Sequence, residues 1–203
     1  MIPHRDGMPH YVDAVAASPW VLAVVFVVAG MDALLPFMPS ESTVVACGVA
    51  AASTGRPHLA LLVTAAAAGA YCGDAISFRI GRRSTSISER LTHRRAQAVH
   101  GWVQRLLSSR GGVVVMFARY VPGGRSTTAL AAGLVGYPSA RFHWYTAAGV
   151  LLWSIQAALI GYLGGALFAE HPILGFLLAS GMALAVTGLA VLVQSTASRV
   201  PAP

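Results

Sequence analysis

Two pairs of charged side chains interrupt apolar stretches of this chain. Asp32 and Glu41 flank one proline-containing break, and Arg119 and Arg125 flank a second. A charged side chain at the centre of a bilayer costs about 2.5–3.5 kcal/mol on insertion scales. If these stretches lie in a membrane, four such groups are better explained by function than by packing. We therefore take the four charges as the candidate functional site.

The two kinds of charge predict a coupled chemistry. Arginine's planar guanidinium binds a carboxylate or a phosphate through paired hydrogen bonds. Short helices are expected to begin at Ser40/Glu41 and at Gly124/Arg125, so the charge of Arg125 adds to the helix dipole and needs an anion nearby. An anionic headgroup that displaces a carboxylate from an arginine would leave that acid in a poorly hydrated site, where it takes up a proton more readily. We expect substrate binding by Arg119, Gly123, Gly124 and Arg125, and proton coupling by Asp32, Glu41 and Asp74.

The composition indicates a membrane setting. Hydrophobic residues make up 56% of the 203 residues and charged residues only 10%, whereas a soluble domain carries about 25% charged residues. All of the basic residues are arginines, and they border apolar runs, so membrane topology explains the net charge of +7 better than nucleic acid binding does. The histidines and the two cysteines have no metal-ligand spacing. We expect no metal, no cofactor, no nucleic acid partner and no enzymatic activity, because neither a Walker loop nor a nucleophile–base pair is present.

Two segments are predicted to enter the membrane and turn back. Residues 19–55 are broken at Pro36 and Pro39, and residues 113–136 are broken at Pro122. Each apolar arm is shorter than the roughly 20 residues that a spanning helix needs. Irregular backbone at membrane depth is tolerated only where protein or a water-filled cavity surrounds it. Both segments therefore read as re-entrant hairpins.

The remaining segments fit a multi-pass protein. Residues 59–80, 142–169 and 173–194 are candidates for full transmembrane helices, after a loose lead at residues 1–18. Residues 82–110 form a basic amphipathic pattern that is expected to end at Gly111 and Gly112. The concentration of arginines places that segment, and with it the C-terminus, in the cytoplasm.

The two hairpins share a sequence pattern. Pro39-Ser40-Glu41-Ser42-Thr43 and Pro122-Gly123-Gly124-Arg125-Ser126-Thr127 both run from proline through a charge to Ser-Thr and a small-residue helix. One full crossing lies between the hairpins, so they enter from opposite faces. This is the inverted-topology repeat of secondary transporters, in which the site lies at the repeat interface near the midplane. The predicted fold class is an all-α polytopic membrane protein.

A purely structural alternative exists for these charges. The four could form a buried ion-pair network that only locks the hairpins together, although such pairs stabilise less than apolar residues do. For Asp74, a local pair with Arg79 or Arg82 is an equal alternative to a direct functional role.

The order of these motifs resembles the DedA family, whose domain is also called VTT or SNARE-associated. The resemblance covers about residues 20–170. It implies a bacterial inner-membrane protein with two re-entrant hairpins, in a family whose members resemble flippases for undecaprenyl phosphate or phospholipids, with proton coupling through the acidic pair. Asp32 stands where glutamate is more usual, and Tyr137 stands where methionine is common. The residues that carry the resemblance are Asp32-x3-Pro36-x2-Pro39-Ser40-Glu41, Gly73-Asp74-x6-Gly81-Arg82, Phe117-Ala118-Arg119-Tyr120-Val121-Pro122-Gly123-Gly124-Arg125, Gly133, Phe142 and Trp153-x7-Gly161-Tyr162-x-Gly164.

The leading functional hypothesis is proton-coupled translocation of a phosphate-bearing lipid, with membrane lipids and protons as partners. The alternatives are an ion or small-solute/proton antiporter, an enzyme acting on lipid phosphate, and a non-catalytic scaffold for the membrane. The identity of the lipid, the direction of transport and the oligomeric state do not follow from these residues.

Overall fold

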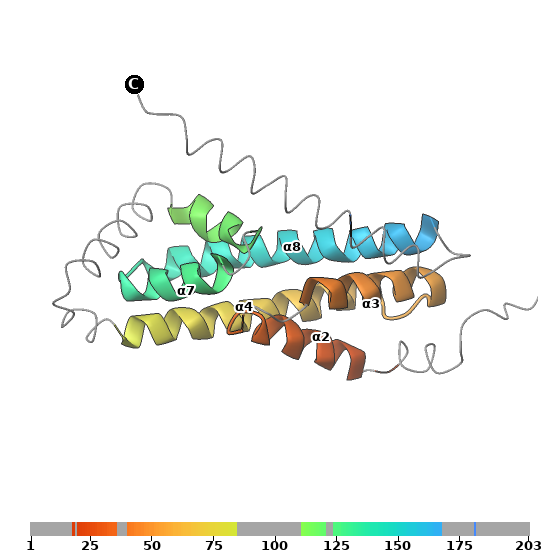
Figure 1. Cartoon of the computed structure of the whole chain (residues 1–203), viewed down its shortest axis with the longest axis horizontal. Coiled ribbons are helices and arrows are strands. Elements are labelled where there is room, and N and C mark those ends of the chain that lie inside the picture. The colour runs from red at the N-terminus through yellow and green to blue at the C-terminus, as the bar shows by residue number, and fades with distance from the viewer. Residues whose placement is uncertain are drawn as a thin grey trace, which may run out of the picture.

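The computed structural model describes residues 18, 20–35, 40–84, 111–120, 124–167 and 181. Within these residues the chain is helical and contains no strand (Figure 1). This agrees with the all-α prediction. The elements in order are α2 (Trp20–Met31), α3 (Ser40–Thr54), α4 (Leu59–Arg83), the 3₁₀ helix η1 (Ala118–Tyr120), α7 (Gly124–Leu134) and α8 (Ser139–Leu167).

Among the residues described here, two helices, α4 and α8, are long and apolar enough to cross a membrane. Helix α4 continues to Arg83, three residues beyond the predicted end. The backbone N–H of Ser84 caps it by donating to the carbonyls of Ile80 and Gly81. Arginines in the last turn also favour the extension, because their charge opposes the negative end of the helix dipole.

The short helices begin where the sequence predicts. Helix α3 starts at Ser40 with Glu41 in its first turn, and α7 starts at Gly124. A carboxylate in the first turn is favourable, since it faces the positive end of the dipole. Residues 111–117 are helical, so Gly111 and Gly112 belong to this helical segment, while residues 85–110, whose end they are expected to mark, lie outside the described residues.

Close backbone contacts hold the short helices on the long ones. Helix α2 packs against α4, α3 against α8, and α7 against α4. A Cβ added at Gly73 would collide with the carbonyl oxygen of Gly30, and one added at Gly161 would collide with that of Val45. Small residues thus permit the close helix approach that membrane proteins use in place of a hydrophobic driving force.

The contacts divide each long helix into two halves. On α4, Gly69 meets Phe26 of α2 in the first half, and Gly81 meets Leu130 of α7 in the second. On α8, Gly149 meets Met116 in the first half, and Gly161 meets α3 in the second. Figure 1 shows α3 toward one end of the bundle and α7 toward the other, with α8 running along both. Each long helix therefore carries one short helix from its own half of the chain and one from the other half.

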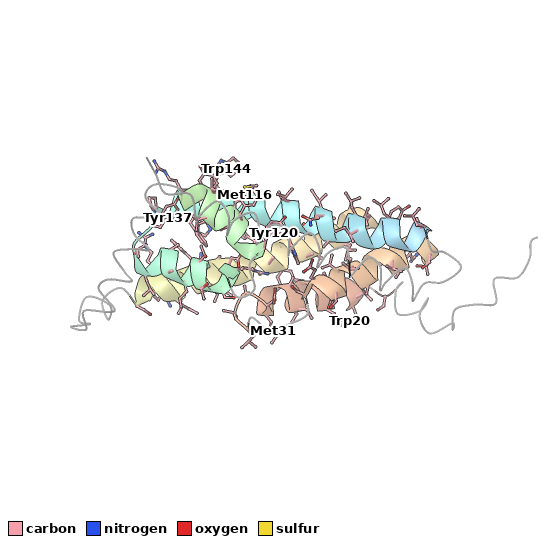
Figure 2. All side chains as sticks on the ribbon, turned by 45° about the horizontal axis from the view of Figure 1, so that its top comes forward. Trp20, Met31, Met116, Tyr120, Tyr137 and Trp144 are labelled. Atoms are coloured by element: carbon pink, nitrogen blue, oxygen red, sulfur yellow. The ribbon has the colours of Figure 1, made fainter. Side chains whose placement is uncertain are left out.

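Apolar side chains fill the interior and also cover the outside. Val25, Leu62 and Val150 belong to one buried cluster, and Phe78 stacks on Phe142 in a second. Many large apolar side chains are exposed, a distribution that suits a lipid environment better than water. Figure 2 shows Trp20, Met31 and Trp144 at the outer edge of the bundle, where they are 76%, 37% and 78% exposed.

Several predictions fall outside the described residues. They concern residues 1–17 of the lead, residues 85–110 of the amphipathic segment, the helix predicted at 173–194 except for Gly181, and the positions of Pro36, Pro39, Pro122 and Gly123.

Candidate functional site

Asp74, from the middle of α4, lies at the centre of a buried ion network. Its Oδ1 accepts a hydrogen bond of 2.8 Å from Nε of Arg125. Its Oδ2 accepts one of 2.9 Å from Nη2 of Arg119. The side chain of Asp74 is only 5% exposed, so one carboxylate bridges both arginines away from solvent.

Arg125, the second residue of α7, is bonded through all three of its nitrogens. Besides Asp74, it donates from Nη1 to Oδ2 of Asp32 at 3.1 Å. Its Nη2 donates to the backbone carbonyls of Ala29, at 2.9 Å, and Ala70, at 3.2 Å. These acceptors come from α2, the turn after it and α4. The anion that the start of α7 requires is thus supplied by two carboxylates of the protein itself.

Asp32 is the most exposed member of the network. It lies in the turn after α2, and its side chain is 21% exposed, against 10% for Arg125. The hydroxyl of Ser40, the first residue of α3, donates to Oδ2 of Asp32 at 2.7 Å. The same oxygen of Asp32 therefore accepts hydrogen bonds from Ser40 of α3 and from Arg125 of α7. We call Asp32, Asp74, Arg119 and Arg125 the charge quartet; with both acids ionised its net charge is zero.

Arg119, in η1, is bonded less completely. One nitrogen, Nη2, reaches Asp74, whereas Nη1 is buried and has no hydrogen-bond partner among the described residues. The guanidinium carbon lies 5.9 Å from the centre of the Trp153 ring on α8, within cation–π range. Arg119 therefore has a buried N–H donor, on Nη1, that no group among the described residues accepts.

Comparison with known proteins places this chain in a family. A VTT domain matches residues 35–163 of the chain. The chain belongs to the DedA family of membrane proteins. Inner membrane protein YqjA of Escherichia coli strain K12 is 30% identical over 179 residues, covering 82% of this chain and 80% of that protein. Protein DedA of the same strain is 26% identical over 156 residues, covering 72% and 69%. An uncharacterized membrane protein of Mycobacterium leprae, ML0287, is 30% identical over 176 residues, covering 82% and 77%. No solved structure matches.

In this DedA-family chain, the structure brings together three of the four charges named first and replaces the fourth. We expected Glu41 to be the second carboxylate facing the arginines, and Asp74 occupies that place. Glu41 is half-buried at the start of α3, and among the described residues it makes no ion pair. The charge of Asp32 acts on Glu41, and the charge of Glu41 acts on the hydroxyl of Tyr120, which itself donates to Gln156 at 3.0 Å. Glu41 thus borders the quartet without joining it, because α3 packs on α8 while α7 packs on α4.

The alternative of a local pair for Asp74 is wrong. Arg79 is exposed, and Arg82 donates at 3.5 Å to the carbonyl of Tyr137 while lying over the Phe78 ring. A helix turns about 100° per residue, so a residue five positions along, such as Arg79, points well away from Asp74. Helical geometry therefore directs Asp74 inward to the distant arginines.

The backbone carbonyls in the network had no sequence signal. Ala29 and Ala70 bind Arg125 through their main-chain oxygens, and Ser77 donates to the carbonyl of Ala33 at 3.2 Å. A carbonyl oxygen has two lone pairs and can accept a second hydrogen bond inside a helix, but nothing in a side-chain pattern says which carbonyl does so. Among the described residues, no group of three histidine, cysteine or acidic side chains could hold a metal ion.

Proposed function

We propose that this protein translocates a phosphate-bearing lipid across the bacterial inner membrane, with coupling to protons. The observation that carries the proposal is a buried, electrically neutral quartet with one partly exposed and exchangeable carboxylate, Asp32. The membership in the DedA family and the name of its relative YqjA, an inner membrane protein, support the location.

We infer a topology in which α4 and α8 cross the membrane and the two hairpins are re-entrant. Helices of 12 and 15 residues in the first hairpin, and of 11 residues in the second, support this, because each is shorter than a bilayer crossing requires. Each long helix also contacts one short helical segment from each half of the chain, which is the packing expected of an inverted repeat. The quartet then lies between the hairpin tips, near the midplane.

The coupling follows from one exchange of partners. A phosphate oxygen that binds Nη1 of Arg125 displaces Oδ2 of Asp32, which keeps only the Ser40 hydroxyl as a hydrogen-bond partner. A carboxylate without its guanidinium, in a site of low dielectric, is favoured in the protonated form. One monoanionic phosphate plus one proton leaves the net charge of the site unchanged. The lipid and the proton are therefore expected to bind together.

Asp32 suits the exchange better than Asp74 does. Asp74 bonds both arginines and is 5% exposed, so removing it from either would leave a charge buried without a partner. Asp32 bonds one arginine and is 21% exposed. We assign Asp74 to holding the two arginines in place.

The test is transport per folded molecule in reconstituted vesicles, with thermal unfolding measured in parallel. Arg125→Lys keeps the charge but loses the fork, and we expect transport to fall sharply while the protein remains folded. Asp32→Asn should reduce the response of transport to an imposed pH gradient. Arg56→Lys is the control, since Arg56 is exposed in the loop after α3 and should behave as the native chain.

Three outcomes would contradict this assignment. Full activity of Arg125→Lys and Asp32→Asn would remove the quartet from transport. Loss of activity in proportion to loss of stability would make the quartet a structural lock. Release of inorganic phosphate from the lipid during the assay would show an enzyme, which we propose the protein is not.

A second candidate function is an ion or small-solute/proton antiporter. The half-buried Glu41, which makes no ion pair among the described residues, favours it, because such an acid is free to bind a proton or a cation. Proton flux driven by a solute gradient in vesicles that lack a phosphate-bearing lipid would support this candidate over the first.

A further inference from the structure

Two buried polar atoms near the quartet have no hydrogen-bond partner among the described residues: Nη1 of Arg119 and Oγ1 of Thr146. Both side chains are almost fully buried, with Arg119 5% and Thr146 4% exposed. Most buried polar groups in proteins are satisfied, and leaving one unpaired costs about 1–3 kcal/mol, or more for a charged group. Two such atoms in one region call for an explanation.

The two atoms flank the same part of α8. Thr146 and Gly149 are three residues apart, so they are neighbours on the helix surface, with about 5–6 Å between their Cβ positions. Nη1 of Arg119 lies 3.6 Å from the place where a Cβ on Gly149 would be. The guanidinium nitrogen and Thr146 thus both lie beside Gly149, a residue that has no side chain.

The groups around Arg119 hold its guanidinium in place. Trp153 lies one turn beyond Gly149, and its ring is 5.9 Å from the guanidinium carbon of Arg119. Nη2 of Arg119 is held by Asp74 at 2.9 Å, which fixes the direction of the free nitrogen. We call Arg119, Thr146, Gly149 and Trp153 the Gly149 face.

We propose that the Gly149 face is a phosphoryl-binding subsite, in which Nη1 of Arg119 and the hydroxyl of Thr146 donate hydrogen bonds to the oxygens of one phosphate monoester. The inference rests on the proposed function and adds to it a residue, Thr146, and the place where the phosphate is held. A guanidinium N–H and a hydroxyl are both strong donors to a phosphate oxygen. The hydroxyl can also accept, so it tolerates a protonated phosphate oxygen. Arg125 is less suited to this first contact, because all three of its nitrogens already donate to groups of the protein.

The subsite also suggests an order of events. Phosphate first meets the free nitrogen of Arg119 and the hydroxyl of Thr146, which displaces no protein partner. Exchange of Asp32 at Arg125 follows. The first contact therefore needs no proton. The second step takes one up, so the completed binding of the lipid still includes a proton.

The experiment uses the full-length protein in lipid nanodiscs with Trp153 as the reporter. Replacing Trp20, Trp102 and Trp144 by phenylalanine leaves Trp153 as the one tryptophan of the four in the chain. Farnesyl phosphate and inorganic phosphate are titrated separately, with farnesol as the uncharged comparison. We expect farnesyl phosphate to change the Trp153 fluorescence saturably and farnesol not to do so.

Variants at Thr146 then separate the effect of the hydroxyl from the effect of side-chain volume. Thr146→Val keeps the shape and removes the donor, and we expect affinity for farnesyl phosphate to fall about tenfold, the loss that corresponds to one hydrogen bond of ordinary strength. Thr146→Ser restores the hydroxyl and should bind within about twofold of the native chain on the same scale. Thr146→Ala is a second test should the valine variant fold poorly. Ser154→Ala is the matched control, because Ser154 is buried on the same helix and already donates to the carbonyl of Leu151 at 3.1 Å.

The outcomes distinguish the subsite from the function on which it rests. Inorganic phosphate binding as tightly as farnesyl phosphate would identify free phosphate as the source, and much weaker binding would identify a lipid headgroup; both support a phosphoryl subsite. Unchanged affinity in Thr146→Val and Thr146→Ala, while Arg125→Lys still abolishes transport, would overturn the subsite alone. Failure of the native chain to bind either phosphate would overturn the subsite and the phosphate-bearing substrate together.

Discussion

The start of α7 and the 3₁₀ turn η1 each present one arginine to the carboxylate of Asp74, but the two arginines differ in how many hydrogen bonds they make. Arg125 of α7 gives four hydrogen bonds, two to carboxylates and two to backbone carbonyls. Arg119 of η1 gives one to Asp74 and keeps Nη1 without a partner among the described residues. Two arginines six positions apart thus differ: Arg125 joins three segments of the protein, and Arg119 has a donor without a partner among the described residues.

The difference arises from what each segment packs against. Helix α7 lies on α4, and α2 lies on the other half of the same helix, so Arg125 enters the junction of three segments that offer acceptors. The segment before η1 lies on α8. There Thr146 carries a hydroxyl, Trp153 carries a ring and Gly149 has no side chain, so none of the three offers a carboxylate. The substitutions below test this contrast, from the largest expected effect to the smallest.

Asp74→Asn should have the largest effect on stability. It removes the one carboxylate that both arginines share and leaves two buried guanidiniums partly uncompensated, so we expect a loss of about 3–5 kcal/mol. Thermal unfolding in detergent measures this. Asp32→Asn is the comparison and should lose clearly less, because Asp32 is more exposed and pairs with one arginine. Equal losses in the two variants would contradict the central position of Asp74.

Gly73→Ala should disturb the Arg125 side selectively. An added Cβ would collide with the carbonyl oxygen of Gly30 and push α2 off α4, at about 1–3 kcal/mol for overpacking. Asp32 and the Ala29 carbonyl move with α2, whereas the contact between Arg119 and Asp74 does not depend on α2.

Gly149→Ala is the matched change on the Arg119 side, where the added Cβ would lie 3.1 Å from the carbonyl oxygen of Met116. We expect unfolding at a lower temperature for Gly73→Ala than for Gly149→Ala, and weaker phosphate binding for Gly149→Ala; the reverse ranking would show that the two sides are not separate.

Arg125→Lys and Arg119→Lys sharpen the comparison directly. A lysine cannot reproduce the fork that reaches Asp74, Asp32 and the carbonyls, so Arg125→Lys should lose about 1–2 kcal/mol. Arg119→Lys should lose less, since one hydrogen bond is at stake. Denaturation in detergent gives the stabilities, and the farnesyl phosphate titration gives the binding. A stability loss at Arg119 as large as that at Arg125 would mean that Arg119 is also a structural lock.

Glu41→Gln should have the smallest effect on stability. Glu41 makes no ion pair among the described residues, and we expect a change within about 0.5 kcal/mol. Transport should nevertheless become less responsive to an imposed pH gradient, because the charge of Asp32 acts on Glu41 and so links the two acids. Vesicle transport at two external pH values checks this. An unchanged pH response would leave Asp32 as the proton site without help from Glu41.

Sequence alone predicted the helices and the location of the breaks. Apolar runs of limited length, interrupted by proline and charge, predicted the short helices, and α3 and α7 begin at Ser40 and Gly124 as expected. The two long apolar helices followed from length and composition. These features are local: they depend on residue type, spacing and the dipole at a helix end, and a sequence carries all of that information.

Only the tertiary structure decided which acid meets which arginine. Glu41 and Asp74 were both available, and the packing of α7 on α4 and of α3 on α8 brought Asp74 to Arg125 and left Glu41 at the edge. The sequence likewise did not indicate that the carbonyls of Ala29 and Ala70 would bind Arg125, or that the hydroxyl of Thr146 would have no partner among the described residues. The physical reason is that partner choice depends on the rotation of each helix about its axis and on the depth at which two helices cross. Both are determined by glycine-lined contacts between segments that lie far apart in the chain.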